Sequence, residues 1–332
     1  MTPTISVILP VFNGRRFLAQ AVASVARQTL PPDELILVDD GSSDGSLRLV
    51  ESLDLPFPVR VVCQGNAGQS AARNHGASIA RGDLFAFLDQ DDIWHQEHLQ
   101  ALTAALAAED ETAWVYSDFD EIDVGGHVVT HCFLREHGSK HPKASVADCV
   151  AADLMVLPSA SVLRREAFFA VGGFDEALCG YEDDDLFLRV FRAGWGHVFL
   201  PRALLRFRIH GGGSSANLHF LQSRLHFAAK LQEMLPDDPR MRRYYLRDCI
   251  APRFFQTTLD DYVRACAARD WEAAREELRM LNHFARLREA GLQLRWKMLW
   301  IQQPHLFRTL VSVNSHLPRP LRFLDNPVLT SP

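Results

Sequence analysis

The sequence predicts an α/β domain with a mostly parallel central sheet, followed by an all-α C-terminal region. Short apolar runs alternate with helical repeats between residues 5 and 108, and a strand-helix-strand-helix order is typical of parallel sheets. After residue 215 the chain becomes rich in Leu, Ala and Arg at helical spacing. We therefore expect an α/β domain over residues 1–215 and a helical region over residues 216–332.

The first half of the α/β domain, residues 1–92, is read from its apolar runs and breakers. Each expected strand is rich in β-branched or aromatic residues, and each expected helix repeats its apolar residues every three or four positions. Pro10 ends the first strand, and Pro31-Pro32 ends the helix after it. The expected strands are residues 5–9, 35–38, 59–62 and 84–88, and the expected helices are residues 17–28, 46–53, 70–80 and 94–108.

The second half, residues 93–215, has a looser pattern that predicts mixed strands and helices. Its expected strands are residues 113–116, 128–133, 161–163, 197–200 and 204–208, and its expected helix is residues 184–193. Four helices are expected beyond it, at residues 220–235, 241–269, 271–290 and 292–301. The last of these is aromatic and basic, which fits a packed helix or, as the alternative, a face for a membrane or partner.

The composition excludes several classes of protein. The net charge is -6 and no Lys/Arg run forms a stripe, so nucleic acid is not an expected partner. Six cysteines without a C-x-x-C pair predict neither a zinc site nor a disulfide framework, which favours the reduced cytoplasm. The sequence shows no signal-peptide pattern and no apolar run of membrane-spanning length. We expect a cytoplasmic protein, either soluble or peripheral on the inner face of the cell membrane.

An acidic motif after the fourth expected strand is the strongest functional signal. Asp89, Asp91 and Asp92 follow an apolar run, where ligands of open α/β sheets bind. Like charges this close repel unless a cation lies among them, and hard oxygen ligands suit Mg²⁺ or Mn²⁺. Such cations borrow further ligands from a substrate's phosphates. The motif predicts a metal-diphosphate site, and its alternative is a solvated turn that caps the next helix.

Three more loops follow expected strands and should meet the acidic motif at one edge of the sheet. In these loops Asp40 can accept hydrogen bonds from a base or ribose, and Phe12 can lie against a base. Arg73 can meet a phosphate or a carboxylate. Together the loops predict a nucleotide pocket, although each alone is ordinary turn chemistry. The loops are residues 10–14, 39–45 and 64–74.

These motifs, taken in order, resemble glycosyltransferase family 2 over about the first 215 residues. The resemblance rests on Ser6-Val-Ile-Leu-Pro-Val-Phe-Asn-Gly, Val38-Asp-Asp-Gly-Ser-Ser-Asp-Gly, Gly65-Asn-Ala-Gly-Gln-Ser-Ala-Ala-Arg-Asn and Phe87-Leu-Asp-Gln-Asp-Asp-Ile-Trp. It implies the Rossmann-like GT-A fold, an inverting mechanism and a nucleotide-diphospho-sugar donor, a UDP- or dTDP-sugar. It also implies that Asp40 binds the nucleoside, with Pro10, Phe12 and Arg73 in the donor site. Asp89 and Asp91 would form the D-x-D site, with Asp91 favoured as the metal ligand.

A second acidic stretch resembles the family's acceptor-side segment. Gly172-Gly-Phe-Asp-Glu is followed by Tyr181-Glu-Asp-Asp-Asp, and the match implies that Asp183 is the catalytic base, paired with Glu182. A helix amino terminus would favour the carboxylate of Asp183, while its acidic neighbours would raise its pKa. The alternative interpretation is a helix cap.

The segment Arg208-Ile-His-Gly-Gly-Gly-Ser-Ser ends the α/β domain. In related transferases a histidine here can complete the metal shell, and flanking Arg and Ser groups can reach the diphosphate. The resemblance therefore implies His210 as a ligand, better suited to Mn²⁺ than to Mg²⁺, and Ser214 as a donor contact. A plain loop histidine fits the sequence equally well.

Three positions depart from the family pattern. Phe12 stands where Tyr is frequent, which keeps stacking but loses a hydroxyl contact. Gln90 lies between the two motif aspartates, a variant loosely associated with deoxysugar transfer, so both hexosyl and deoxyhexosyl transfer stay open. Asp184 stands where an aromatic residue is often seen, which leaves the acceptor subsite open.

We expect a metal-dependent inverting glycosyltransferase acting on a hydroxyl acceptor. The family's usual acceptors are glycans or glycolipids of bacterial surface polysaccharide or lipopolysaccharide. The C-terminal helices would complete the acceptor side, or mediate membrane contact or a homodimer. One alternative is a nucleotide-sugar-binding module without activity. Another is a serine hydrolase in which Ser43, in a G-x-S-x-G pattern, is the nucleophile, although the His210-Gly-Gly-Gly loop follows it in the wrong order.

Overall fold

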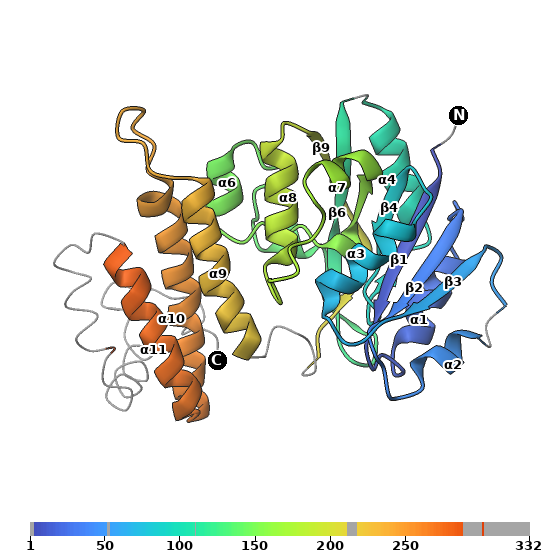
Figure 1. Cartoon of the computed structure of the whole chain (residues 1–332), viewed down its shortest axis with the longest axis horizontal. Helices are drawn as coiled ribbons and strands as arrows, with labels where there is room; N and C mark the ends of the chain where they lie inside the picture. The colour runs from blue at the N-terminus through green and yellow to red at the C-terminus, as the bar shows by residue number, and fades with distance from the viewer. Residues whose placement is uncertain (1–2, 52–53, 110, 211–217, 288–300, 302–332) are drawn as a thin grey trace. The chain divides into compact units, whose positions relative to one another are not determined.

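The computed structural model describes residues 3–51, 54–109, 111–210, 218–287 and 301 (Figure 1). The chain divides into two compact units. The first unit comprises Met1–Cys149 and Leu154–Arg224, and the second comprises Val150–Asp153 and Leu225–Pro332.

A mixed sheet forms the centre of the first unit, with the strand order β3-β2-β1-β4-β8-β6-β9-β5 and with β7 paired to β6. The side of the sheet from β3 to β4 is parallel, as predicted, whereas β8 runs antiparallel to both β4 and β6. The strands are β1 (Ile5–Val11), β2 (Glu34–Asp39), β3 (Val59–Cys63), β4 (Leu84–Phe87), β5 (Ile93–Trp94), β6 (Thr112–Ile122), β7 (Val128–Thr130), β8 (Ser161–Arg164) and β9 (Gly196–Arg208).

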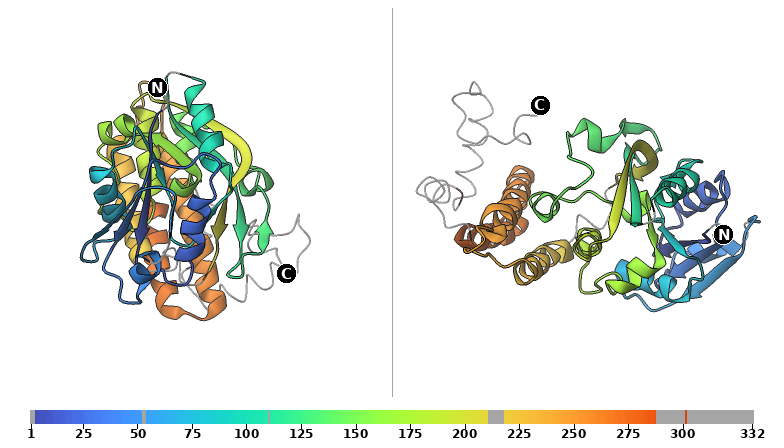
Figure 2. Two further views of the ribbon diagram at one scale, coloured as in Figure 1. Left: turned by 90° about the vertical axis from the view of Figure 1, so that its right-hand side faces the viewer. Right: turned by 90° about the horizontal axis from the view of Figure 1, so that it is seen from above.

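Helices cover both faces of this sheet (Figure 2), which explains why β1, β2 and β4 are buried along their whole length. Every residue of β1 is buried. On one face α1 and α4 pack in the hydrophobic core, and on the other Gly76 of α3 lies so close that a Cβ there would be 2.5 Å from Ile8 Cγ2. The helices are α1 (Leu18–Ala26), α2 (Ser46–Glu51), α3 (Gln69–Ile79), α4 (His98–Ala107), α5 (Phe133–Glu136), α6 (Val146–Val150), α7 (Arg165–Ala170) and α8 (Glu182–Arg192).

The structure differs from the predicted elements where strands are short or interrupted. Trp94 was expected to begin a helix, but Ile93 and Trp94 form β5, which pairs antiparallel with β9, and α4 begins only at His98. The two strands expected at 197–200 and 204–208 are one strand, β9. Its register against β6 shifts between Leu200 and Ala203, a bulge that accommodates Pro201, which has no N–H to donate.

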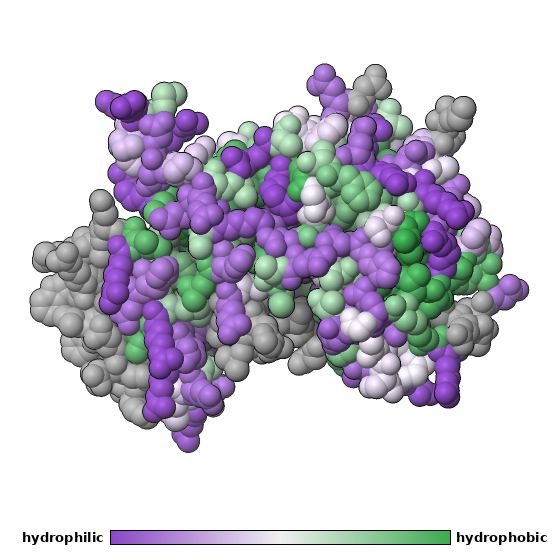
Figure 3. All heavy atoms as spheres, viewed as in Figure 1, coloured by the Kyte–Doolittle hydropathy of each residue, from purple (hydrophilic) through white to green (hydrophobic). Residues whose placement is uncertain are grey.

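The second unit is helical, as predicted for the C-terminal region. It contains most of α9 (Leu218–Met234), together with α10 (Ala251–Ala268) and α11 (Trp271–Leu287). Phe254 of α10 stacks on Phe284 of α11 at 5.5 Å. Hydrophilic residues line the outward faces of α10 and α11 (Figure 3), and no helix among the described residues is both long and apolar enough to span a membrane. The expected boundary at residue 215 lies outside the described residues, and so does the expected helix 292–301 except for residue 301.

Candidate active site

The candidate site lies at the carboxyl edge of the parallel strands. The register pairs Val11 at the end of β1 with Asp39 at the end of β2, and Asp39 with Cys63 at the end of β3. The loops that follow these strands therefore start side by side. The acidic motif follows β4, which pairs with β1 on the side opposite β2.

Asp40 organises the loop between β3 and α3. It is 3% exposed, and its Oδ1 accepts hydrogen bonds from Gln64 Nε2 at 2.9 Å and from the N–H of Ala67 at 2.8 Å. Its Oδ2 accepts the N–H of Gly68 at 2.8 Å. These three donors hold the carboxylate in one orientation. The role of Asp40 toward a nucleoside stays a prediction.

Phe12 and Gln90 form a pair that the sequence did not reveal. The ring of Phe12 is 45% exposed at the end of β1, where a base could lie against it, while Pro10 is buried within the strand. The N–H of Phe12 donates to Gln90 Oε1 at 2.9 Å, and Gln90 Nε2 donates to the carbonyl of Phe12 at 3.0 Å. The side chain between the two D-x-D aspartates thus fixes the loop after β1.

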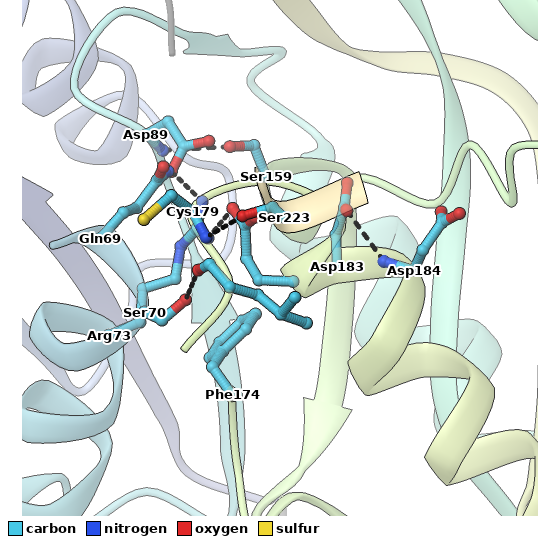
Figure 4. Close-up of polar contacts among 12 residues, drawn as sticks. Gln69, Ser70, Arg73, Asp89, Ser159, Phe174, Cys179, Asp183, Asp184 and Ser223 are labelled. Atoms are coloured by element: carbon cyan, nitrogen blue, oxygen red, sulfur yellow. Dashed lines mark hydrogen bonds and ion pairs between the residues drawn. The ribbon is translucent and has the colours of Figure 1, made fainter. Parts of the chain in front are cut away.

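Arg73 joins the D-x-D motif to α8 (Figure 4). Its guanidinium is buried, and it donates to Asp89 Oδ1 at 2.6 Å and to Glu182 Oε1 at 3.2 Å. Gln69 Nε2 also donates to Asp89 Oδ1 at 3.0 Å, and the guanidinium lies 5.1 Å from the ring centre of Phe174. The structure thus shows two carboxylate partners for Arg73. Its contact with a nucleotide stays a prediction.

Asp91 and His210 meet although 119 residues separate them. His210 Nε2 lies 2.7 Å from Asp91 Oδ2, and the imidazole packs on Phe17 with 5.3 Å between ring centres. Burial, and then the negative charge of Asp89, raise the pKa of Asp91, while the contact with His210 lowers it. Burial, followed by the charges of Asp91 and Asp89, holds the pKa of Asp92 well above its usual range. Three carboxylates therefore lie close together in a buried place that disfavours their charged forms.

The donor set at this point fits a divalent cation that shares its ligands with a substrate. Asp91 and His210 supply one carboxylate and one imidazole, while Asp89 is held by Arg73. No group of three or more acidic, Cys or His side chains with metal-binding geometry occurs among the described residues. Mg²⁺ and Mn²⁺ usually keep several waters and take oxygens from a substrate's phosphates, so two protein ligands are compatible with such a site. Metal binding here stays a prediction.

Asp183 lies in the first turn of α8, next to the Arg73 cluster. Its Oδ1 accepts the N–H of Asp184 at 2.8 Å. The two acidic residues that follow are committed to the fold, since Asp184 accepts the N–H of Leu154 at 3.1 Å and Asp185 pairs with Arg189 at 2.6 Å. Burial, followed by the charges of Asp184 and Glu182, raises the pKa of Asp183 well above its usual range. A carboxylate with a raised pKa is a stronger base.

Two remaining sequence hypotheses concern serines. Ser214 lies outside the described residues. Ser43 donates its hydroxyl to Asn13 Oδ1 at 3.3 Å, and an amide oxygen cannot serve as the base that a nucleophilic serine needs.

Comparison with known proteins gives a consistent picture. The model of the family described as glycosyl transferase family 2 matches residues 6–168. An uncharacterized glycosyltransferase YwdF of Bacillus subtilis is 30% identical over 194 residues, covering 56% of this chain and 67% of that protein. The O-antigen biosynthesis protein RfbC of Myxococcus xanthus is 33% identical over 205 residues, 60% of this chain but 15% of RfbC.

The chain spans little more than a third of the first relatives matched, whereas a solved structure matches nearly the whole chain. The chain spans 34% of an uncharacterized glycosyltransferase of Nostoc and 39% of another of Rickettsia conorii. The structure of Staphylococcus aureus TarS 1–349 in complex with UDP-GlcNAc superposes with a TM-score of 0.65 at 16% identity, covering 94% of this chain and 91% of that one. At that identity the likeness shows a shared fold.

Proposed function

Since the chain belongs to glycosyltransferase family 2, we propose that it is a metal-dependent inverting enzyme that transfers a sugar from a nucleotide-diphospho-sugar to a hydroxyl acceptor. One observation carries the proposal. The guanidinium of Arg73 contacts both Asp89 of the D-x-D motif and Glu182, the residue before the proposed base. A donor held at the motif would therefore lie beside Asp183, as a direct displacement requires.

The donor nucleotide lies along the carboxyl edge of the sheet in this proposal. Asp40 takes donors of the nucleoside, the exposed ring of Phe12 lies against the base, and Pro10 supports that loop from β1. Ser214, which lies outside the described residues, is a further donor contact implied by the family resemblance. The UDP-GlcNAc complex of TarS, which shares the fold, supports a nucleotide-diphospho-sugar as the ligand of such a site. The Gln90 contacts with Phe12 support it too, because they tie the base-binding loop to the diphosphate-binding motif.

Asp91 and His210 would hold the cation, and the guanidinium of Arg73 holds Asp89. A bound Mn²⁺ or Mg²⁺ would neutralise charge that develops on the departing diphosphate. Arg73 orients the carboxylate of Asp89 through an ion pair at 2.6 Å, which holds this end of the motif in one arrangement.

Asp183 takes the proton of the acceptor hydroxyl as that oxygen attacks the anomeric carbon opposite the diphosphate. One displacement inverts the configuration and needs no enzyme nucleophile. The raised pKa of Asp183 supports this role, because the carboxylate binds a proton more strongly than an exposed one would. Glu182, held by Arg73, flanks the base.

The acceptor in this proposal is a glycan or glycolipid of a bacterial surface polysaccharide. The similarity to RfbC, an O-antigen biosynthesis protein, supports that class. The C-terminal helices complete the acceptor side or contact a membrane or a second copy. An inactive binding module would lack a base or metal residue, whereas Asp91 and Asp183 are both present.

Calorimetric titration with nucleotide diphosphates and nucleotide-sugars tests the proposal, each with Mn²⁺, with Mg²⁺ and with a chelator. We expect one nucleotide to bind and its affinity to collapse with chelator. NMR of the product anomer with a matching acceptor, or of the sugar released to water, then reports inversion. Absence of nucleotide binding under every condition, or retention of configuration, would overturn the proposal.

A further inference from the structure

Arg208, at the end of β9, is a buried cation that faces inward. It is 3% exposed, and each nitrogen of its guanidinium has an acceptor. Nε donates to the carbonyl of Asp91 at 2.9 Å, and Nη1 donates to the carbonyl of Asp123 at 2.9 Å. Nη2 donates to Gln20 Oε1 at 2.8 Å. The guanidinium is thus fully engaged by protein oxygens rather than directed at a diphosphate.

The same residue is tied to the Asp91–His210 pair by two further contacts. The backbone N–H of Arg208 donates to Asp92 Oδ1 at 3.1 Å. Its guanidinium lies 4.5 Å from the centre of the Phe17 ring, and the ring of His210 packs on Phe17 as well. Arg208 and His210 therefore share one aromatic support on the loop before α1.

Three segments that are distant in sequence meet on this one planar cation. They are the D-x-D loop, the turn between β6 and β7, and α1. The acceptors diverge around the plane of the guanidinium, a geometry that the single ammonium of a lysine cannot reproduce. Only a planar group with several fixed donors holds all three at once.

We propose that Arg208 is the positioning residue of the cation site: it fixes the backbone of Asp91 and the aromatic support of His210, and so keeps the carboxylate and the imidazole together. The proposal rests on the proposed function, in which that pair holds the cation. Residues that orient metal ligands in this way typically change metal affinity by about 10- to 100-fold when they are removed.

Arg208→Lys, with Arg164→Lys as the matched control, tests the assignment. Arg164 donates from Nε to the carbonyl of Thr112 at 2.7 Å and belongs to β8, whose register pairs it with Leu84 at the opposite edge of the sheet. The measurement is calorimetric binding of UDP, or of whichever nucleotide the full chain binds, over a Mn²⁺ series and with chelator. Thermal unfolding of each variant is recorded in parallel.

We expect Arg208→Lys to lower the apparent affinity for Mn²⁺ in the nucleotide-binding series by about tenfold or more. Nucleotide affinity in the presence of chelator should equal that of the unmodified chain. Arg164→Lys should leave the Mn²⁺ series unchanged. An unchanged series for Arg208→Lys, or equal losses in both variants, overturns the positioning role. A chain without any Mn²⁺-dependent nucleotide binding would instead refute the proposed function, and this inference with it.

Gln20→Ala decides the case if Arg208→Lys does not fold. The Gln20 side chain is exposed and supplies one acceptor of the guanidinium, so its truncation loosens Arg208 without emptying the core. We expect the apparent affinity for Mn²⁺ in the nucleotide-binding series to fall several-fold, with an unchanged unfolding temperature. Full Mn²⁺ affinity in Gln20→Ala, together with an unfolded Arg208→Lys, overturns the proposal.

Discussion

At the amino edge of the central sheet, Glu34 accepts hydrogen bonds from Ser6 Oγ at 2.7 Å and from the N–H of Arg81 at 2.6 Å. Asp83 accepts both the N–H and the hydroxyl of Thr4, and these contacts lower its pKa. At the carboxyl edge, burial and neighbouring carboxylates raise the pKa of Asp91 and Asp183.

The two edges show that carboxylates at strand ends serve opposite purposes. Where backbone and hydroxyl donors surround a carboxylate, its charge stabilises the fold. Where carboxylates surround one another in a buried site, the fold maintains an unfavourable arrangement, and such perturbed groups cluster at functional sites. Removing a carboxylate charge should therefore lower stability at the amino edge, whereas at the carboxyl edge it should relieve an unfavourable arrangement.

The largest expected effect is that of Asp183→Asn. The amide cannot accept the acceptor's proton, so turnover should fall by about 10²- to 10⁴-fold, the usual contribution of general base catalysis. Donor binding should persist, because the carboxylate of Asp183 accepts its hydrogen bond from the N–H of Asp184 within α8. Asp83→Asn is the control at the amino edge and should retain turnover. Steady-state kinetics and calorimetry check this, and a fully active Asp183→Asn would remove the base assignment.

Asp91→Ala should abolish the dependence of nucleotide binding on Mn²⁺. Because loss of a residue that merely orients a ligand costs about 10- to 100-fold in metal affinity, loss of the ligand itself should cost at least as much. His210→Gln should act in the same direction, since its imidazole lies 2.7 Å from Asp91. Calorimetry with Mn²⁺ and with chelator measures the difference, and Asp91→Ala with normal Mn²⁺-dependent affinity would contradict the ligand role.

Arg73→Gln should move the pH dependence of catalysis rather than remove it. The positive charge of Arg73 lowers the pKa of Asp183, against the larger effects of burial and of Asp184 and Glu182. Without that charge the base would bind its proton more tightly, so the acidic limb of the kcat/KM profile should shift to higher pH by about one unit. Arg164→Gln, at the other edge, should leave the limb in place. A shift to lower pH would contradict this electrostatic role.

How much of this site the sequence revealed depends on the range of the contacts. The strands and the D-x-D motif could be predicted because buried apolar runs and clustered carboxylates are local patterns. The partner of Arg73 could not, since Glu182 lies 109 positions away. The contacts of Gln90 and Arg208 had no local signal either, because these side chains donate hydrogen bonds to the backbone carbonyls of Phe12 and Asp91. Only the assembled sheet brings those groups together.

A third environment, the core between the edges, is represented by His98. Its side chain is fully buried and stacks on Trp94 at 4.4 Å. To donate to the carbonyl of Leu204 at 3.1 Å, Nδ1 must carry the proton, and Nε2 has no hydrogen-bond partner among the described residues. Protonation would place a charge in the core without a partner. Burial accordingly lowers the pKa of His98 from 6.5 to about 3.

The smallest expected effect follows from that pKa. Below pH 6.5 His98 binds a proton in the unfolded chain but stays neutral in the folded chain, so the free energy of unfolding falls as pH decreases. The slope from this residue approaches about 1.4 kcal/mol per pH unit between pH 6 and pH 4. His98→Gln keeps an N–H donor for Leu204 but cannot be protonated, so its unfolding free energy should depend less steeply on pH. Chemical denaturation at several pH values measures the slope. His127→Gln is the control and should keep the original slope, because its side chain is 85% exposed. An equal slope in the unmodified chain and in both variants would show that His98 is solvated in the folded state.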